Sequence, residues 1–134
     1  MKTSSLSYVA LGLVITFGAL HFVAEKFYLY WTLWWFDNLI HLVAGFAGGL
    51  VIVWLLFASD EFNNRVSATF KVVLTVVASV LVVGIAWEIF EYVNKITQTT
   101  ESYALDTSLD LLFDVLGAVL ASVAGVKRVF GTRR

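Results

Sequence analysis

Carboxylate and imidazole side chains recur along this chain at intervals of three or four residues. The repeated spacings fall at four places: His21 and Glu25; Asp37 and His41; Glu88 and Glu91; and Asp106, Asp110 and Asp114. Residues three or four apart share one face of a helix. Carboxylates combined with imidazoles, from several helices of a bundle, form a ligand set typical of divalent metal ions. The chain has no Cys, so thiolate sites and disulfides are excluded.

Some of these residues also have a structural explanation. Asp37 and Asp106 stand where helices are expected to begin, so each could cap a helix N-terminus. Glu25 is next to Lys26 and could be an interfacial charge, and His21 could be a hydrogen-bonded packing residue. The sequence leaves these alternatives open.

The two glutamates of AWEIFEYV, residues 86–93, are harder to explain structurally. They follow a long uncharged run and are expected at a helix C-terminus, where the helix dipole disfavours anions. Neighbouring carboxylates repel each other unless they are protonated or neutralised by a cation. Asp110 and Asp114, one and two turns into the last expected helix, raise the same question. No Lys or Arg falls in the outer half of a span, so protons or a divalent ion (Zn, Mn, Fe, Mg or Ca) remain as candidates.

The elements that position these residues are membrane helices. Of the 134 residues, 60% are hydrophobic and only 14% are charged, which indicates a membrane protein. Crossing a hydrocarbon layer of ~30 Å takes about 20 residues, and four apolar segments approach that length, near residues 6–23, 38–58, 68–92 and 109–126. The first segment is expected to be a retained helix because no signal-cleavage pattern ends it. We therefore predict an all-α fold, a polytopic four-transmembrane-helix bundle forming one domain over residues 1–134. Strands are not expected, because an open sheet edge cannot be satisfied in lipid.

The basic residues predict how the bundle sits in the membrane. Two of the nine, Lys26 and Lys95, fall on one side; seven fall on the other, namely Lys2, Arg65, Lys71, Lys127, Arg128, Arg133 and Arg134. Cytoplasmic segments are enriched in Lys and Arg. We therefore expect a multi-pass protein of the inner (cell) membrane with both termini cytoplasmic. Eight of the ten acidic residues then lie on the outer side, and only Asp60 and Glu61 fall in the cytoplasmic loop. The stretch FYLYWTLWWF, residues 27–36, is expected to be an aromatic anchor at the outer interface.

Partners follow from the same composition. The lipid bilayer is the first, and the sequence leaves open a homo-oligomer and a lipid-linked small-molecule substrate. No basic patch with interleaved aromatic residues occurs, so no nucleic-acid partner is expected.

Small residues indicate where helices pack closely. Two small-xxx-small steps, Ala44 with Gly48 and Gly45 with Gly49, occur in one segment, and the last segment carries Gly117, Ala118, Ala121 and Gly125 below its aspartates. Such steps let membrane helices approach each other. We predict that the helices pack closely in the cytoplasmic half of the bundle and enclose a polar cavity in the outer half.

Three motifs carry a resemblance to known proteins. DNLIH at 37–41, WEIFEY at 87–92 and LDTSLDLLFDVLGA at 105–118 resemble the YjdF-type inner-membrane proteins and, more distantly, the VanZ-like family. Both pair an Asp-x-x-x-His helix with a later glutamate and an acidic helix that ends in Gly. The matching positions are Asp37, His41, Glu88, Glu91, Asp106, Asp110 and Gly117. Three positions depart from the pattern: Leu105 replaces an expected Trp, Ser108 an expected Gln, and Asp114 a small apolar residue. The resemblance implies a site and outward-facing envelope work, but no particular reaction.

Four functions are compatible with these features. In a metal-dependent hydrolase, the ion would activate water for attack on an envelope or lipid-linked substrate. In a cation or proton pathway, the same acids would bind ions transiently, although few polar residues continue below Asp114. His21 and His41 could instead be axial ligands of a b-type haem, for which the carboxylates would be surplus. A small accessory subunit with a structural polar site is the fourth possibility.

The charge distribution makes the orientation testable by cysteine labelling. Because the chain lacks Cys, single cysteines can be placed at Thr99, in the expected outer loop, and at Asn63, in the expected cytoplasmic loop. An impermeant thiol reagent added to intact cells should label Thr99→Cys and leave Asn63→Cys unmodified. The reverse labelling pattern would contradict both the orientation and an external site.

Overall fold

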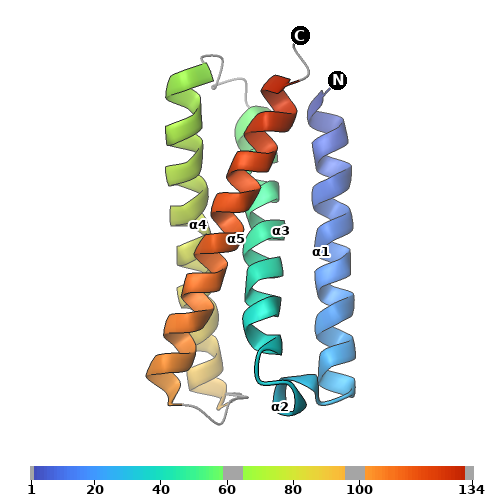
Figure 1. Ribbon diagram of the computed structural model, residues 1–134, viewed down its shortest axis with the longest axis vertical. Coiled ribbons are helices and arrows are strands. Elements are labelled where there is room, and N and C mark those ends of the chain that lie inside the picture. Colours follow the sequence, from blue (N-terminus) through green and yellow to red (C-terminus); the bar gives the residue numbers. More distant parts are fainter. Residues whose placement is uncertain (1, 59–64, 96–101, 132–134) are drawn as a thin grey trace.

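The computed structural model consists of long helices joined by short segments (Figure 1). It describes residues 2–58, 65–95 and 102–131, and no strand occurs within them. The helices are α1 (Lys2–Lys26), α2 (Leu29–Thr32), α3 (Phe36–Ala58), α4 (Arg65–Asn94) and α5 (Tyr103–Gly131). Asp60, Glu61, Thr99, Asn63, Arg133 and Arg134, which entered the prediction of orientation or its test, lie outside the described residues.

Four helices are long and apolar enough to cross a membrane, which confirms the predicted fold class. These spans are Ser5–Lys26, Phe36–Ala58, Thr69–Asn94 and Tyr103–Val129. The last span begins six residues before the predicted start, because the helix continues through its acidic first turns. The Asp106 amide already donates to the Ser102 carbonyl, 3.1 Å away, and Asp37 is the second residue of α3. Both aspartates therefore lie inside their helices, and the alternative that they are N-caps is excluded.

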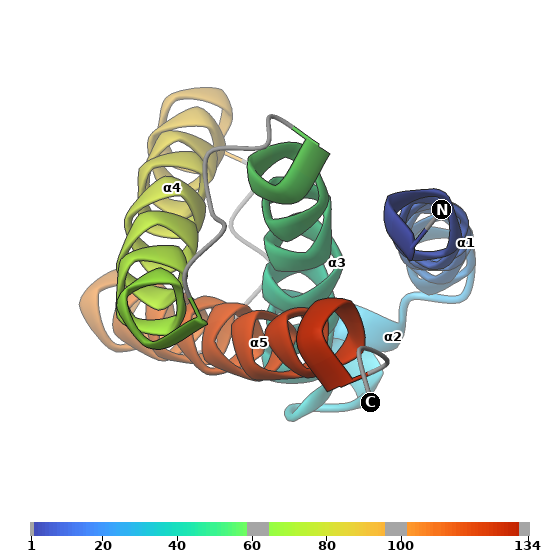
Figure 2. The same ribbon diagram turned by 90° about the horizontal axis from the view of Figure 1, so that it is seen from above.

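The bundle is built around the α3–α5 pair. These two helices make the closest contact, α4 packs against both, and α1 packs on α3 with a smaller contact to α5 (Figure 2). The start of α1 and the end of α5 lie at one end of the bundle, whereas α2 and the start of α3 lie at the other (Figure 1). The candidate site residues therefore lie toward the end opposite the termini.

Glycine allows α3 and α5 to approach this closely. A Cβ added to Gly117 would overlap the Leu42 carbonyl oxygen and would lie 2.6 Å from the Phe46 nitrogen. A Cβ on Gly45 would likewise overlap the backbone of Asp114. The predicted close packing is thus confirmed for this pair of helices.

The other small-residue step has a different role. A Cβ added to Gly48 would meet no atom within 4 Å, and both Gly48 and Ala44 line a cavity. They were expected to pack helices together, but they leave space instead. Because successive helical residues point about 100° apart, Gly45 faces α5 while Ala44 faces away from it. The packed region and the open region therefore lie side by side around α3, not one below the other.

The apolar core fills the half of the bundle nearest the termini. Val53 of α3, Val72 and Val76 of α4, and Ala118 and Ala121 of α5 are fully buried there. These small and β-branched side chains let the helices approach closely, and the larger Leu6, Leu50 and Phe57 complete the same cluster. The core thereby holds α3, α4 and α5 in the register that brings their polar ends together.

The aromatic stretch is partly a folded cap. Trp34 is 82% exposed, as expected of an interfacial anchor, but Tyr30 and Phe36 are buried against Ala24 and Ile40. Tyr28 adopts a left-handed conformation, with φ of 56°, where the chain turns from α1 into α2. Part of this stretch therefore covers the polar end of the bundle.

The glycine contact gives a stability prediction. Gly117→Ala should lower the stability of the bundle by about 1–3 kcal/mol, because its methyl group must push α3 away. Melting temperature in detergent measures the effect. Gly12→Ala is the matched control, since its Cβ meets nothing within 4 Å. Equal melting temperatures for both variants would contradict the steric account.

Candidate metal centre

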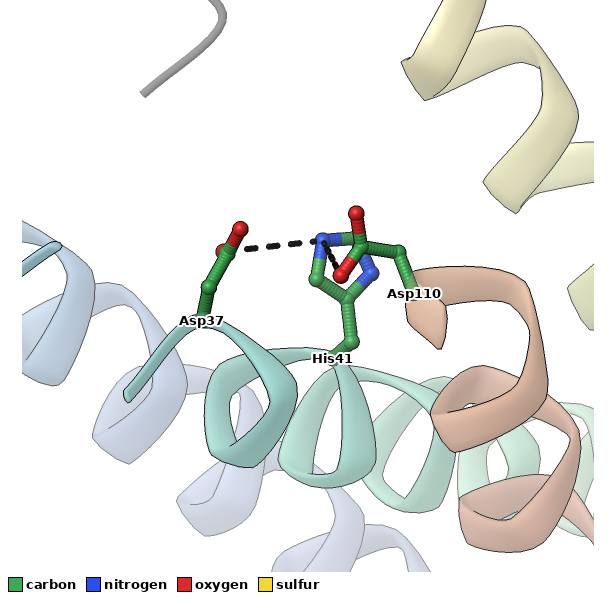
Figure 3. Close-up of side chains that lie close together, drawn as sticks. All are labelled: Asp37, His41 and Asp110. Atoms are coloured by element: carbon green, nitrogen blue, oxygen red, sulfur yellow. Dashed lines mark ion pairs between the residues drawn. The ribbon is translucent and has the colours of Figure 1, made fainter. Parts of the chain in front are cut away.

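One imidazole lies between two carboxylates near the α2 end of the bundle (Figure 3). His41 Nε2 is 3.8 Å from Asp37 Oδ1 and 3.8 Å from Asp110 Oδ1. Asp37 and His41 are one helical turn apart on α3, and Asp110 comes from α5. His41 is 7% exposed and Asp110 is 2% exposed. The crossing at Gly45 thus brings a second helix to a buried histidine.

These separations fit a shared ion better than direct hydrogen bonds. A distance of 3.8 Å exceeds the roughly 2.7–3.2 Å of an N–H···O bond. Two ligands that each lie about 2.1 Å from a tetrahedral ion are roughly 3.4 Å apart. One ligand atom from each of Asp37, His41 and Asp110 lies within 4.8 Å of the other two. These three residues could therefore hold a metal ion.

A third carboxylate approaches the other nitrogen of the same ring. Asp114 Oδ1 is 3.4 Å from His41 Nδ1, which has no hydrogen-bond partner at bonding distance. In metal sites a ligating histidine commonly donates its second N–H to a carboxylate, which fixes the ring. Gly84 of α4 makes room for this group, because a Cβ there would lie 2.6 Å from Asp114 Oδ2. Asp114 thus lies next to the triad of Asp37, His41 and Asp110, on the Nδ1 side of the His41 ring.

The two glutamates of α4 point in different directions. Glu88 is buried against α5, where the Thr107 hydroxyl donates to its Oε2 at 2.7 Å and the Tyr103 hydroxyl donates to its backbone carbonyl at 3.1 Å. Its Oε1 is buried without a hydrogen-bond partner. Glu91, three residues later, lines the cavity and does not share the contacts of Glu88 with α5.

The cavity has a volume of about 520 Å³ and lies between α1 and α4, over α3. Six polar residues line it: His21, Tyr30, Asp37, His41, Glu91 and Asp114. The candidate metal ligands Asp37 and His41 therefore border an open space in which a small molecule could reach them. The volume is within the range of small-molecule sites, about 300–1,000 Å³.

His21 belongs to a second cluster at the edge of this cavity. The Tyr30 hydroxyl is 2.7 Å from His21 Nδ1, and the Trp87 ring meets His21 edge-on with centroids 6.4 Å apart. Burial, aided by the charges of Asp37, Glu25 and Glu91, raises the pKa of Tyr30. The hydroxyl therefore stays protonated and can donate a hydrogen bond to His21 Nδ1 when that nitrogen carries no proton.

The structure separates the nine candidate residues into groups. Asp37, His41 and Asp110 form the triad; Asp114 touches His41; His21 and Glu91 line the cavity; Glu88 faces α5; Asp106 lies one turn before Asp110; and Glu25 is exposed. The polar layer is thus a triad with surrounding groups, in which Glu25 is the most peripheral.

A comparison with protein families shows which family the chain matches. Residues 1–129 match the family described as "Predicted membrane protein (DUF2238)". The chain belongs to this family. No curated protein and no solved structure matches the chain. The description of the DUF2238 family gives a membrane location and no reaction, so the chemistry of this member has to be argued from its site.

Two residues of this DUF2238 protein that hydrogen-bond to candidate site residues were missed in the sequence. Thr107 lies four residues after Tyr103 and three before Asp110, on the polar face of α5, so its spacing could have revealed it. Tyr30 lies in an aromatic stretch without helical periodicity, and no local signal distinguishes it from Tyr28. Only the fold of α2 against α1 places Tyr30 at His21.

The Glu88 contact gives a prediction for the site of the DUF2238 protein. Thr107→Val keeps the shape of the side chain but removes the donor to Glu88, so the protein should lose about 1.5–3 kcal/mol of stability if Glu88 is charged. Melting temperature is the measurement. Ser108→Ala is the control, because that hydroxyl is exposed and bonds only to the Ala104 carbonyl of its own helix. In the Glu88→Gln background the effect of Thr107→Val should shrink; an undiminished loss would show that the contact is not responsible.

Proposed function

We propose that Asp37, His41 and Asp110 bind one divalent metal ion and that Asp114 orients His41. The observation that carries the proposal is the position of the His41 ring. Its Nε2 lies between two carboxylates and its Nδ1 faces a third, within membrane-spanning helices. A buried imidazole contacted by carboxylates on both ring nitrogens matches a ligating histidine held by an outer carboxylate.

Charge balance supports an ion at this position. The ion pairs of Asp37, Asp110 and Asp114 all involve His41. If all three carboxylates are ionised, one imidazole supplies at most one positive charge, and at least two negative charges are left uncompensated where charges are costly. A divalent ion bound by neutral His41 would leave only one negative charge. That charge would be shared through the contact of Asp114 with the ring.

The ligand types favour some ions over others. Ca²⁺ and Mg²⁺ prefer oxygen ligands alone, whereas imidazole suits Zn and Fe, and carboxylates suit Mn. The triad offers one nitrogen and two carboxylates from a compact, buried position. We therefore propose Zn, Mn or Fe over Mg or Ca.

We further propose that the protein is a hydrolase acting on an envelope or lipid-linked substrate. A divalent ion supplies Lewis acidity, which polarises an ester or phosphoester bond and activates water. Asp37 and His41 border the cavity, so a substrate there could reach the ion, and Glu91 lines the same wall. The proposal includes an inner-membrane location with both termini cytoplasmic and the site facing outward, as the charge distribution predicts, and it agrees with the resemblance to YjdF-type and VanZ-like envelope proteins. A homo-oligomer remains a prediction.

A cation or proton pathway is less well supported. Beyond Asp114 toward the termini, the buried Ser122 hydroxyl donates to Ala118 of its own helix at 2.7 Å. Thr75 is exposed on the lipid side of α4. Among the described residues, neither side chain continues the polar layer through the bundle. A structural site in an accessory subunit stays as the second candidate function.

Metal content tests the proposal directly. Purified protein should contain about one divalent ion per chain by elemental analysis, and chelation should lower its melting temperature, because the carboxylates are then left facing one another. His41→Ala should lose the ion. Glu25→Gln, an exposed neighbour outside the triad, should retain it and serves as the control.

Asp110→Asn separates metal binding from stability. The variant should bind the ion more weakly, yet its metal-free form should melt at a higher temperature than the metal-free wild type, since one repelling charge has gone. Melting curves with and without chelator measure both effects. Absence of bound metal, with no effect of chelator on the wild type, would favour the pathway or the structural site instead.

A further inference from the structure

The cavity between α1 and α4 is too large and too apolar to serve the metal triad alone. Both helices lie on α3, but their backbones do not touch among the described residues, and α1 lies on the far side of α3 from α4 (Figure 2). Side chains of both helices line the space of about 520 Å³ that is left. The feature to be explained is therefore a groove between two membrane-spanning helices.

The lining of this groove changes along its length. Its polar part holds six residues: His21, Tyr30, Asp37, His41, Glu91 and Asp114. Away from that part the wall is hydrocarbon: Val14, Phe17, Ala44, Ile52, Val80 and Val83. At a rise of ~1.5 Å per residue, His41 and Ile52 are about 16 Å apart along α3. The groove thus has the polarity of a lipid, with one polar end and one long apolar part.

We propose that the groove binds one acyl chain of a phospholipid from the leaflet on the α2 side. The apolar wall belongs to the membrane-crossing parts of α1, α3 and α4, so it is continuous with the hydrocarbon of the bilayer. The polar end lies at the level of α2, whose exposed aromatic neighbours mark the interface where headgroups lie. The acyl chain of one lipid would therefore lie against the apolar wall, and its headgroup would lie at the polar end of the groove.

A second helix does not fit the same space. The ring of His21 meets the ring of Trp87 between α1 and α4. This contact spans the gap at the polar end, and a helix with its side chains is about 10–12 Å wide. An acyl chain is thinner than a helix, so it can lie in the apolar part of the groove, on the side of this contact toward the termini, without separating α1 from α4.

The width of the groove depends on small side chains of α3. Gly48 lines the groove, and a Cβ there meets nothing within 4 Å. Gly48→Leu should therefore fill the groove without disturbing the α3–α5 contact. Gly12→Leu is the matched control, because Gly12 is an exposed glycine of α1 with equally free space and lies outside the groove.

Photo-crosslinking tests the proposal. The full chain is reconstituted in phosphatidylglycerol vesicles with a trace of the same lipid carrying a diazirine at mid-chain, irradiated and mapped by mass spectrometry. Groove positions such as Ala44 and Val80 should be labelled several-fold more than Leu74, an exposed residue of α4. Gly48→Leu should abolish this excess, and Gly12→Leu should keep it. Equal labelling of groove and exposed positions, or an excess unchanged in Gly48→Leu, would overturn the proposal.

The result is separable from metal binding. The proposal rests on the proposed function only in placing the lipid headgroup next to an ion. Asp110→Asn, a change in the triad at a residue that does not line the groove, should weaken metal binding and still show the labelling excess in the groove, which would support the lipid site even if hydrolysis is absent. Gly48→Val, a smaller filling, should reduce the excess partially and guards against a folding defect of the leucine variant. Circular dichroism confirms that each variant is folded.

Discussion

The close approach of α3 and α5 at their glycines is the constraint on which the rest of the structure depends. Gly45 and Gly117 lie so near the opposite backbone that neither tolerates a Cβ without displacement. In a membrane, water does not drive helices together, so close packing of small residues supplies much of the attraction. The same contact fixes the register of α5 against α3. Because His41 lies one turn before Gly45, and Asp110 and Asp114 lie within two turns before Gly117, this register brings both aspartates to the His41 ring.

The bundle is asymmetric around α3, and this asymmetry gives the site its access. One face of α3 is closed by α5, while the neighbouring face, with Ala44 and Gly48, is left open between α1 and α4. Small residues on neighbouring faces of α3 therefore have opposite roles: Gly45 allows close packing against α5, whereas Ala44 and Gly48 leave the cavity open. The triad lies at the boundary, with Asp110 on the packed side and Asp37 and His41 bordering the cavity. A buried site with one accessible edge combines a low dielectric with an entry path, which strengthens any electrostatic interaction made there.

Hydrogen bonds around the site hold the peripheral groups. Thr107 and Tyr103 fix Glu88 and its helix against α5, and Tyr30 fixes His21 beneath the cap formed by α2. These contacts join α4 to α5 and α1 to α2, so the ends of four helices are linked near the triad. Such links matter because isolated carboxylates in a membrane span are costly. The hydrogen-bonded groups around the triad therefore form two separate sets, one between α4 and α5 and one between α1 and α2.

The sequence alone determined the membrane class, the four helical spans and the level at which the polar residues gather, because apolar length and three-to-four spacing are local properties of a helix. It also indicated the small residues of the α3–α5 contact. It did not separate Gly45 from Ala44 and Gly48, nor Glu88 from Glu91, although each pair divides between different neighbours. The division into a triad, an adjacent Asp114 and an exposed Glu25 was likewise decided only by the tertiary structure. The physical reason is that spacing fixes the angle of a side chain about its own helix axis, whereas its neighbours depend on how the helices cross and rotate against one another.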